Sequence, residues 1–172
     1  ISVRVFDQHY MQGVYETQDR ASEVVVSAFC QLSAKSDSCF TAKNRRLSVH
    51  HSLTIAQGDT VTLEKIVWVT HRSDKALSQE SFARNALADL KVSAARGYDA
   101  LLESSAYAWK EVWRDARVEV TSAEQQDQMA LDYAVWHLTT MTPAHDERSS
   151  IAAKGLTGEG YKGHVFWDTE IF

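Results

Sequence analysis

The sequence predicts an α+β chain in which strands come first and helices follow. Three observations support this prediction. Apolar and polar residues alternate through much of the first seventy residues, apolar residues then recur at helical spacing after Ser78, and the only proline, Pro143, follows the last helical stretch. The change of period at residues 72–80 marks a boundary, and a second break falls at residues 118–122. This order favours an α+β chain or two segregated domains.

The strand pattern is clearest between Arg46 and Val69. Apolar residues alternate with polar ones from Arg46 to Ile55, and the alternation resumes at Val61 after a break at residues 57–59 that contains Gly58. Two such runs about a short glycine-containing break predict a β-hairpin. Further strands are expected at residues 24–32 and 1–6. A few strands with one apolar face need a partner sheet, and the chain offers too few strands to build that sheet fully.

Three helices are expected after the strands. The first begins after Ser78, a candidate N-cap, and Gly97 suits its end. The second runs from Gly97 with apolar residues on one broad face, and a short connector leads to the third. The spacing of Thr121 and Glu124 predicts a capping box at the start of the third helix, and Pro143 ends it.

Composition is typical of a globular domain and argues against several functional classes. Of the 172 residues 44% are hydrophobic and 24% charged, which is typical of folded proteins rather than disordered ones. The net charge of -5 disfavours a general affinity for nucleic acid. No apolar run approaches the roughly 18 residues that span a bilayer. Ile1 is neither an initiator methionine nor the start of a secretory signal, so we expect a fragment of a larger cytoplasmic protein.

The cysteines and histidines give no sign of a metal site or a disulfide scaffold. Cys30 and Cys39 are expected to be free thiols, with Cys30 acting as a small core residue. His50 and His51 are neighbours on a predicted strand, so they point to opposite faces and cannot both bind one metal from that strand. His137 lies among aromatic residues, which favours a structural role. We expect no metal and no cofactor.

The C-terminal segment is different, because four of the seven glycines lie between residues 155 and 163. Glycine at that density lets the backbone turn sharply and approach a ligand closely. The residues that follow include Trp167, Asp168 and Glu170. An indole beside two carboxylates is typical of a sugar site, where the ring stacks and the acids accept hydrogen bonds from hydroxyl groups. If the backbone is extended here, the two acids lie on one side and Trp167 on the other; if it turns, all three can converge.

The stretch from Ser150 to Phe172 resembles the signature of glycoside hydrolase family 65, which includes maltose, trehalose and kojibiose phosphorylases. Ala152 departs from that signature, where glycine is common. A weaker resemblance extends upstream to the residues Leu63, Glu64, Lys65, Val67 to Thr70, Gly97, Tyr98, Asp99, Leu101, Leu102, Trp109 and Trp113. The resemblance implies three parts: residues 1–75 as the C-terminal part of a β-sandwich domain, 76–120 as a helical linker, and 121–172 as the first helix and loop of an (α/α)6 catalytic barrel.

The resemblance also implies an activity. Family members of this kind cleave an α-glucosyl disaccharide with inorganic phosphate, with inversion, to give β-glucose 1-phosphate; phosphate is a co-substrate and no cofactor is needed. The residues that match the subsite for the non-reducing glucosyl unit are Trp167 and Asp168, with His164 and Glu170 as less direct supports. The complete enzyme is expected to be a cytoplasmic homodimer that binds neither nucleic acid nor membrane.

None of these four residues is expected to be catalytic. In the family the general acid is a glutamate well beyond this signature, so the resemblance implies that the 172-residue chain is inactive alone and that its bare sheet face makes it associate. Two alternatives stay open: a hydrolase of the same family, in which water replaces phosphate, and a non-catalytic module that binds carbohydrate or serves in assembly.

Overall fold

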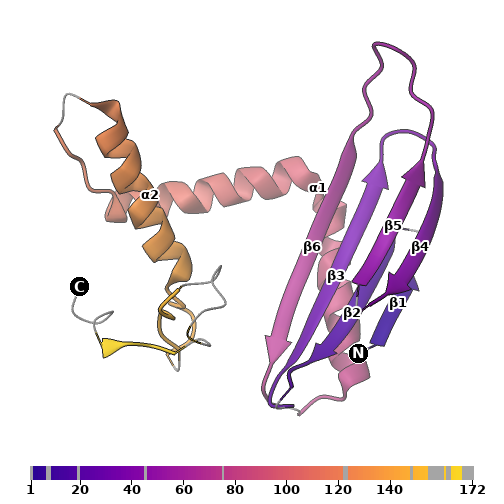
Figure 1. Cartoon of the computed structure of the whole chain (residues 1–172), viewed down its shortest axis with the longest axis horizontal. Coiled ribbons are helices and arrows are strands. Elements are labelled where there is room, and N and C mark those ends of the chain that lie inside the picture. Colours follow the sequence, from indigo (N-terminus) through magenta and orange to yellow (C-terminus); the bar gives the residue numbers. More distant parts are fainter. Residues whose placement is uncertain are drawn as a thin grey trace. The chain divides into compact units, whose positions relative to one another are not determined.

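The described residues form two antiparallel β-sheets and two helices, which confirms the predicted α+β class (Figure 1). The computed structural model describes residues 2–6, 9–18, 20–44, 46–74, 76–121, 124–147, 149–154, 161 and 164–167, with the backbone alone at 2–6 and 125. The strands are β1 (Ser2–Phe6), β2 (Tyr10–Glu16), β3 (Glu23–Leu32), β4 (Asp37–Lys43), β5 (Arg46–Ser52) and β6 (Leu63–Arg72). The helices are α1 (Gln79–Ala116) and α2 (Gln125–Met141).

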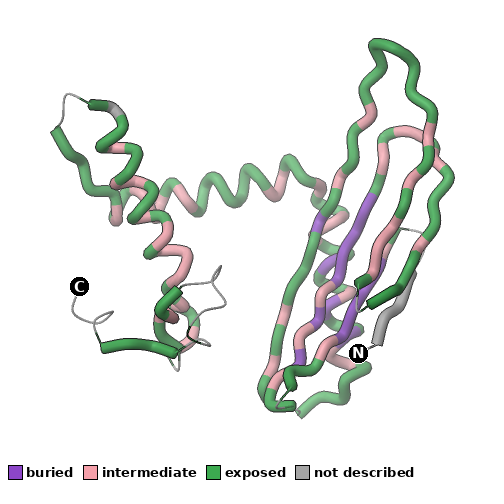
Figure 2. The backbone as a smooth tube through the Cα atoms, in the orientation of Figure 1, coloured by how far each residue is buried: buried purple, intermediate pink, exposed green. Residues whose placement is uncertain are grey.

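The larger sheet has the strand order β1-β2-β3-β6, and β4 and β5 form the second sheet. All paired strands run antiparallel. Buried residues are concentrated along β2, β3 and the first part of α1 (Figure 2). The centre of the four-stranded sheet is therefore the centre of the core.

Helix α1 covers one face of the four-stranded sheet. Alternate residues of β3 face the helix, where Val25 packs against Ala83 and Ala86, and Phe29 packs against Leu90. Both Val25 and Leu90 are fully buried. Such burial contributes about 1.5–3 kcal/mol for each large aliphatic side chain, so this face holds the helix to the sheet.

The small sheet covers part of the opposite face. Met11 of β2 and Ala28 and Cys30 of β3 are buried against Leu47 and Val49 of β5. Alternate residues of β3 thus pack against two different layers, α1 on one face and the small sheet on the other. A second, two-stranded sheet agrees with the expectation of an incomplete sandwich.

The hairpin predicted between residues 46–55 and 61–69 is wrong. Strand β5 pairs with β4, and β6 pairs with β3 instead. Ten residues separate β5 from β6, which is too long for a tight hairpin, whereas residues 44 and 45 alone join β4 to β5. Asn44 takes a positive φ of 51°, as short hairpin loops require. The sequence pattern missed β4 because its side chains are mostly exposed and polar.

Strand β2 was also missed, although it lies inside the sheet. Gln12 is buried in β2 and breaks the apolar alternation on which the strand prediction depends. Its side-chain amide donates to the Ser27 hydroxyl at 2.8 Å and to the Ala83 carbonyl oxygen at 2.9 Å. These bonds satisfy a polar group that would otherwise be costly to bury, and they tie two strands to α1.

Helix α1 begins as predicted. The Ser78 hydroxyl accepts the backbone N–H of Ser81 at 3.1 Å, which is the geometry of an N-cap. Gly97 interrupts the helix with φ 77° and ψ 165°, so α1 consists of two segments that meet at this glycine. The predicted interruption at Gly97 is confirmed.

Helix α2 begins four residues later than predicted. Glu124 occupies the N-cap position and makes no side-chain cap hydrogen bond, so the capping box expected from Thr121 to Glu124 does not form the helix start. The end is as predicted, since the last helical residue is Met141 and Pro143 follows two residues later.

The two cysteines differ in environment. Cys30 is buried and Cys39 is exposed, and both are free thiols. Burial raises the pKa of Cys30, partly offset by the positive charge of Lys65. The prediction that Cys30 is a small core residue is confirmed.

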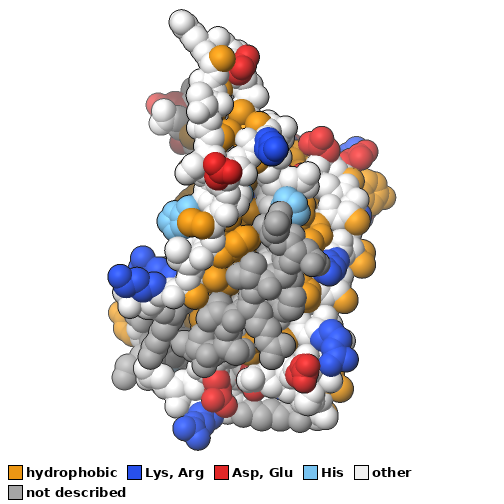
Figure 3. All heavy atoms as spheres, turned by 90° about the vertical axis from the view of Figure 1, so that its right-hand side faces the viewer, with side chains coloured by type: hydrophobic (Ala, Val, Ile, Leu, Met, Phe, Trp, Pro, Cys, Tyr) orange, Lys and Arg blue, Asp and Glu red, His pale blue; other side chains and the backbone are white. Residues whose placement is uncertain are grey.

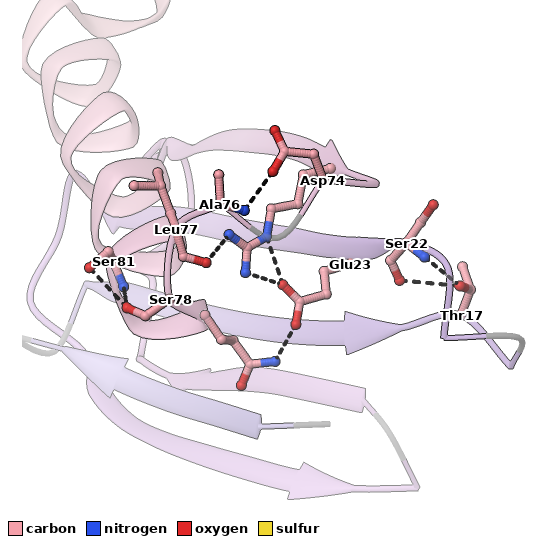
Figure 4. A network of polar contacts seen from close by, with 10 residues as sticks. Thr17, Ser22, Glu23, Asp74, Ala76, Leu77, Ser78 and Ser81 are labelled. Carbon is pink, nitrogen blue, oxygen red and sulfur yellow. Dashed lines mark hydrogen bonds and ion pairs between the residues drawn. The ribbon is translucent and has the colours of Figure 1, made fainter.

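A charged network fastens the start of α1 to the sheet (Figure 4). Arg72 donates to Glu23 through Nε at 2.7 Å and through Nη2, and it also donates from Nη1 to the Leu77 carbonyl oxygen at 2.6 Å. Gln79 donates to the other Glu23 oxygen at 2.9 Å. The guanidinium carbon lies 4.5 Å from the centroid of the Phe82 ring. The side chains of Arg72 and Glu23 are only 12% and 6% exposed, so each charge depends on the other.

The chain divides into two compact units, Ile1–Ser105 and Ala106–Phe172. The first contains both sheets and most of α1, and the second contains the end of α1, the helix α2 and the C-terminal segment. The domain boundaries expected near residues 75 and 120 stay a prediction.

Strand β6 leaves apolar side chains uncovered on the sheet face opposite α1. Leu63, Val67 and Val69 are 54%, 45% and 62% exposed and alternate along one side of the strand. Figure 3, which looks at the molecule from the side of the sheets, shows hydrophobic side chains at the surface among charged ones. Exposed apolar patches of this kind promote association.

We expect the isolated chain to self-associate through this face. Light scattering after size-exclusion chromatography should give a mass above that of one chain, and the variant Val67→Thr with Val69→Thr should lower it. Threonine keeps the β-branched shape that suits a strand while it adds a hydroxyl. A monodisperse monomer of the unmodified chain with a cooperative thermal transition would contradict the expectation.

Replacement of Glu23 by alanine should cost about 3–5 kcal/mol of unfolding free energy, because it leaves the buried Arg72 guanidinium without its carboxylate. Urea unfolding of the chain that carries both threonines would measure it. The control is Glu80→Ala, whose ion pair with Arg84 is about 70% exposed and should cost less than about 0.5 kcal/mol. Equal losses in the two variants would contradict the role given to Glu23.

Candidate functional site

The structure places two of the four predicted site residues. His164 and Trp167 are described and exposed, with 71% of Trp167 accessible, whereas Asp168 and Glu170 lie outside the described residues. The described part of the segment therefore presents an aromatic ring to solvent. Whether the two acids converge with that ring stays a prediction.

Backbone hydrogen bonds join described residues on either side of the glycine-rich stretch. The His164 N–H donates to the Tyr161 carbonyl oxygen at 2.9 Å, and the Ala153 N–H donates to the His164 carbonyl oxygen at 3.2 Å. These bonds bring residues 153 and 164 together from the two ends of the glycine-rich stretch. The backbone of His164 thus has a structural task, and its imidazole stays exposed.

Aromatic packing also joins described residues of this segment. The rings of Tyr161 and Phe166 meet edge to face with centroids 5.5 Å apart, and the Lys154 ammonium lies 5.7 Å from the Tyr161 ring centroid. Such contacts contribute about 0.5–1.5 kcal/mol each. Trp167 lies in a turn of 3₁₀ helix, so the backbone is not extended at this residue. The choice between the extended and the turning alternative stays a prediction, because Asp168 and Glu170 lie outside the described residues.

The second unit also contains a cluster of aromatic side chains where the end of α1 meets α2. Trp109 and Trp113 lie one helical turn apart with centroids 6.2 Å from each other, and Trp136 of α2 lies 6.4 Å from Trp109. His137 contacts the rings of Tyr133 and Trp136 edge to face, at 4.3 and 4.8 Å between centroids. The cluster packs helix against helix, which agrees with the structural roles predicted for His137 and the two tryptophans of α1.

A glutamine fixes the connector that leads into α2. Gln128 accepts the Val120 N–H at 2.9 Å and donates to the Val118 carbonyl oxygen at 3.0 Å. It also donates to Asp132 at 2.7 Å, and Asp132 in turn accepts from Arg117 at 3.4 Å. The side-chain amide pairs with the connector as a neighbouring strand would. This pairing fixes the backbone of the connector at Val118 and Val120.

The histidines of β5 make separate contacts, as their strand position predicts. His50 lies 3.2 Å from the Thr41 hydroxyl, and His51 lies 2.8 Å from the Ser38 hydroxyl. Within the described ranges, no three His, Cys, Asp or Glu side chains gather into a group that could hold a metal ion. No helix among the described residues is both long enough and apolar enough to cross a membrane.

Comparison with known proteins assigns both ends of the chain to one family. Residues 2–112 match the model of the glycosyl hydrolase family 65 N-terminal domain, and residues 132–172 match that of the glycosyl hydrolase family 65 central catalytic domain. The second match contains all four predicted site residues. The first covers both sheets and nearly all of α1.

Several curated proteins are similar to the chain. A kojibiose phosphorylase of Escherichia coli strain K12 is 52% identical over 170 residues, which is 99% of this chain and 22% of that protein. A kojibiose phosphorylase of Halothermothrix orenii is 38% identical over 133 residues, or 74% of this chain and 17% of that protein. A nigerose phosphorylase of Lachnoclostridium phytofermentans is 41% identical over 76 residues, or 44% of this chain and 10% of that protein. The chain thus spans about a fifth or less of the length of these relatives.

Replacement of Gln128 by leucine should release the connector before α2. The change keeps the side-chain size and removes both bonds to the backbone, so the Val120 amide should exchange with solvent about tenfold faster or more. Hydrogen exchange followed by mass spectrometry would show this in the peptide that contains Val120. Gln126→Leu is the matched control, because Gln126 is an exposed glutamine of the same helix. Equal exchange in the two variants would refute the role of Gln128.

Proposed function

The chain belongs to glycosyl hydrolase family 65, and on this premise we propose that it is part of an inverting disaccharide phosphorylase that acts on kojibiose. The observation that supports this most directly is the 52% identity to a kojibiose phosphorylase over nearly the whole chain. In the proposed reaction inorganic phosphate displaces the glycosidic oxygen of an α-glucosyl disaccharide and gives β-glucose 1-phosphate and glucose. A further kojibiose phosphorylase among the relatives supports the same substrate.

The proposal divides the chain into three parts. Residues 1–75 form the end of the β-sandwich domain, 76–120 form the helical linker, and 121–172 begin the catalytic barrel. The two family matches, at 2–112 and 132–172, are compatible with this division and leave a gap around its second boundary. In this arrangement the loop after α2 enters the substrate site from the first helix of the barrel.

Trp167 and Asp168 are the residues that we propose for glucose binding. An exposed indole offers an apolar face on which the C–H groups of a sugar ring can stack. An ionised aspartate accepts hydrogen bonds from sugar hydroxyls, and each such charge-assisted bond contributes about 1.5–3 kcal/mol. His164 and Glu170 would support the same subsite, with the His164 backbone already hydrogen-bonded to Tyr161 and Ala153.

The proposed chemistry needs one proton donor and a place for phosphate. An inverting hydrolase requires a second carboxylate to activate water, but inorganic phosphate is already an anionic nucleophile. The general acid and the phosphate site belong to parts of the enzyme beyond these residues, so none of the four site residues is assigned a catalytic role. We further propose that the complete enzyme is a cytoplasmic homodimer, a compartment with which the free Cys30 and Cys39 thiols are compatible.

A hydrolase of the same family is the second candidate, because a glycosyl hydrolase of Mycobacterium leprae without an assigned activity is 38% identical over 105 residues. The two candidates differ in the product. The intact protein would be incubated with kojibiose in phosphate buffer and in a buffer free of phosphate. Formation of β-glucose 1-phosphate that requires phosphate supports a phosphorylase, whereas equal release of glucose in both buffers supports a hydrolase.

In the intact enzyme, Asp168→Ala should lower kcat/KM for phosphorolysis by about tenfold or more, because one charge-assisted bond to the sugar is lost. Trp167→Ala should also lower it through loss of the stacking face. Glu147→Ala is the control, since Glu147 is an exposed carboxylate ahead of the site segment and should leave kcat/KM within about twofold. Unaltered turnover in Asp168→Ala would refute the assigned role.

A further inference from the structure

We propose that Glu64 is a positioning residue that sets the direction in which helix α1 continues beyond Gly97. Glu64 lies on β6, 34 positions before Tyr98, and its Oε1 accepts the backbone N–H of Tyr98 at 2.7 Å. Tyr98 is the first residue of the second segment of α1. A side chain of the sheet therefore caps a helix segment that begins in the middle of a longer helix.

The bend requires glycine for a backbone reason. Gly97 has φ 77° and ψ 165°, a conformation that L-residues with a side chain rarely adopt. Space is not the constraint, because a Cβ at this position would meet nothing nearer than the Glu64 carboxylate oxygen at 3.9 Å. The bend is thus made by the conformation of Gly97, and something else must hold it, since glycine adopts helical angles as well.

A break in a helix leaves backbone N–H groups without partners. The first N–H groups of the segment after Gly97 have no carbonyl oxygen one turn earlier to accept them. The Glu64 carboxylate satisfies the first of these donors and places a negative charge at the positive end of the segment dipole. Both effects favour the bent form over a straight helix, in which Tyr98 would donate to its own helix and Glu64 would have no such bond.

The surroundings of the bend explain why the bent form of α1 depends on Glu64. A hollow of about 570 Å³ lies beside the bend and is lined by Glu64, Lys65, Arg96 and Tyr98 among others. Water in this hollow could reach the Tyr98 N–H if the carboxylate were removed. The same lining contains the cationic side chains of Lys65 and Arg96.

Two further contacts limit the bend to one direction. Arg96, before the bend, donates to the hydroxyl of Ser104, after it. Leu101 packs against the core group that includes Leu90 and Ala94, so residues on both sides of Gly97 contact the same part of the sheet. Strand β6 therefore holds α1 at two places: the Arg72 end fastens its start, and the Glu64 end fixes the turn of its second segment.

The proposal is tested in the intact protein that contains this chain by two structural measurements, which do not depend on the reaction proposed above. Nitroxides are attached to p-acetylphenylalanine at positions 89 and 103, two exposed sites on either side of the bend. A straight helix would separate these backbone positions by roughly 21 Å. Electron–electron double resonance should give a narrow distribution below that value in the parent, and in Glu64→Ala a broader one that extends toward it.

The second measurement is hydrogen exchange at the Tyr98 amide. Exchange should be about tenfold faster or more in Glu64→Ala, because the bond to a charged acceptor is lost. Glu80→Ala is the matched control, since Glu80 is an exposed glutamate in the first turn of α1 and should leave both measurements unchanged. Parent-like distances and parent-like exchange in Glu64→Ala would overturn the proposal.

Glu64→Gln covers the case in which Glu64→Ala does not fold. The glutamine keeps the size and an acceptor oxygen but loses the charge, which roughly halves the strength of the bond. Exchange at Tyr98 at least about threefold faster than in the parent would support the proposal. Exchange equal to that of the parent would overturn it.

Discussion

The buried pair of Glu23 and Arg72 is the interaction on which the first unit most depends. It joins two neighbouring strands at their paired ends and extends through Arg72 and Gln79 to the start of α1. Burying two charges is costly, and the cost is offset only when every lone pair and proton finds a partner. Here both carboxylate oxygens and all three guanidinium nitrogens are used. The positions of β3, β6 and the start of α1 are therefore fixed together, because these contacts share the same two side chains.

Strand β6 also contacts α1 at the opposite end of the strand, through the carboxylate of Glu64. Apolar packing along α1 is non-directional, so Leu90 and Leu101 hold the helix near the sheet without choosing its path. Hydrogen bonds are directional, and the bond between Glu64 and Tyr98 sets the direction of α1 after Gly97. Residues 98–116 then carry the chain into the second unit, where the tryptophans at the end of α1 pack against α2.

The described part of the candidate sugar site is held by backbone hydrogen bonds and by the contact between the Tyr161 and Phe166 rings. The N–H groups of Ala153 and His164 donate to backbone carbonyl oxygens of this segment, and Trp167 stays largely exposed. An exposed ring with one neighbouring acid offers few convergent groups, and small-molecule sites bury most of their ligand. A subsite of this kind needs further walls, which agrees with a chain that spans 22% of the length of a curated family relative.

The sequence by itself determined those features that depend only on residues close to one another in the chain. The Ser78 cap, the glycine at the bend, the end at Pro143, the strand at residues 23–32 and the small core thiol of Cys30 all follow from chemistry within a few residues. The glycine-rich segment with its adjacent indole and acids likewise indicated a sugar site, although the placement of Asp168 and Glu170 lies outside the described residues.

Only the tertiary structure decided which strands pair, where α2 begins and what fixes the bend. Gln12 could be buried in β2 because Ser27 and Ala83, distant in sequence, satisfy its amide. The side-chain amide of Gln128 likewise bonds the connector backbone at Val118 and Val120. Hydrogen bonds between residues far apart in the chain leave no periodic pattern in the sequence, and for that reason the sequence could not show them.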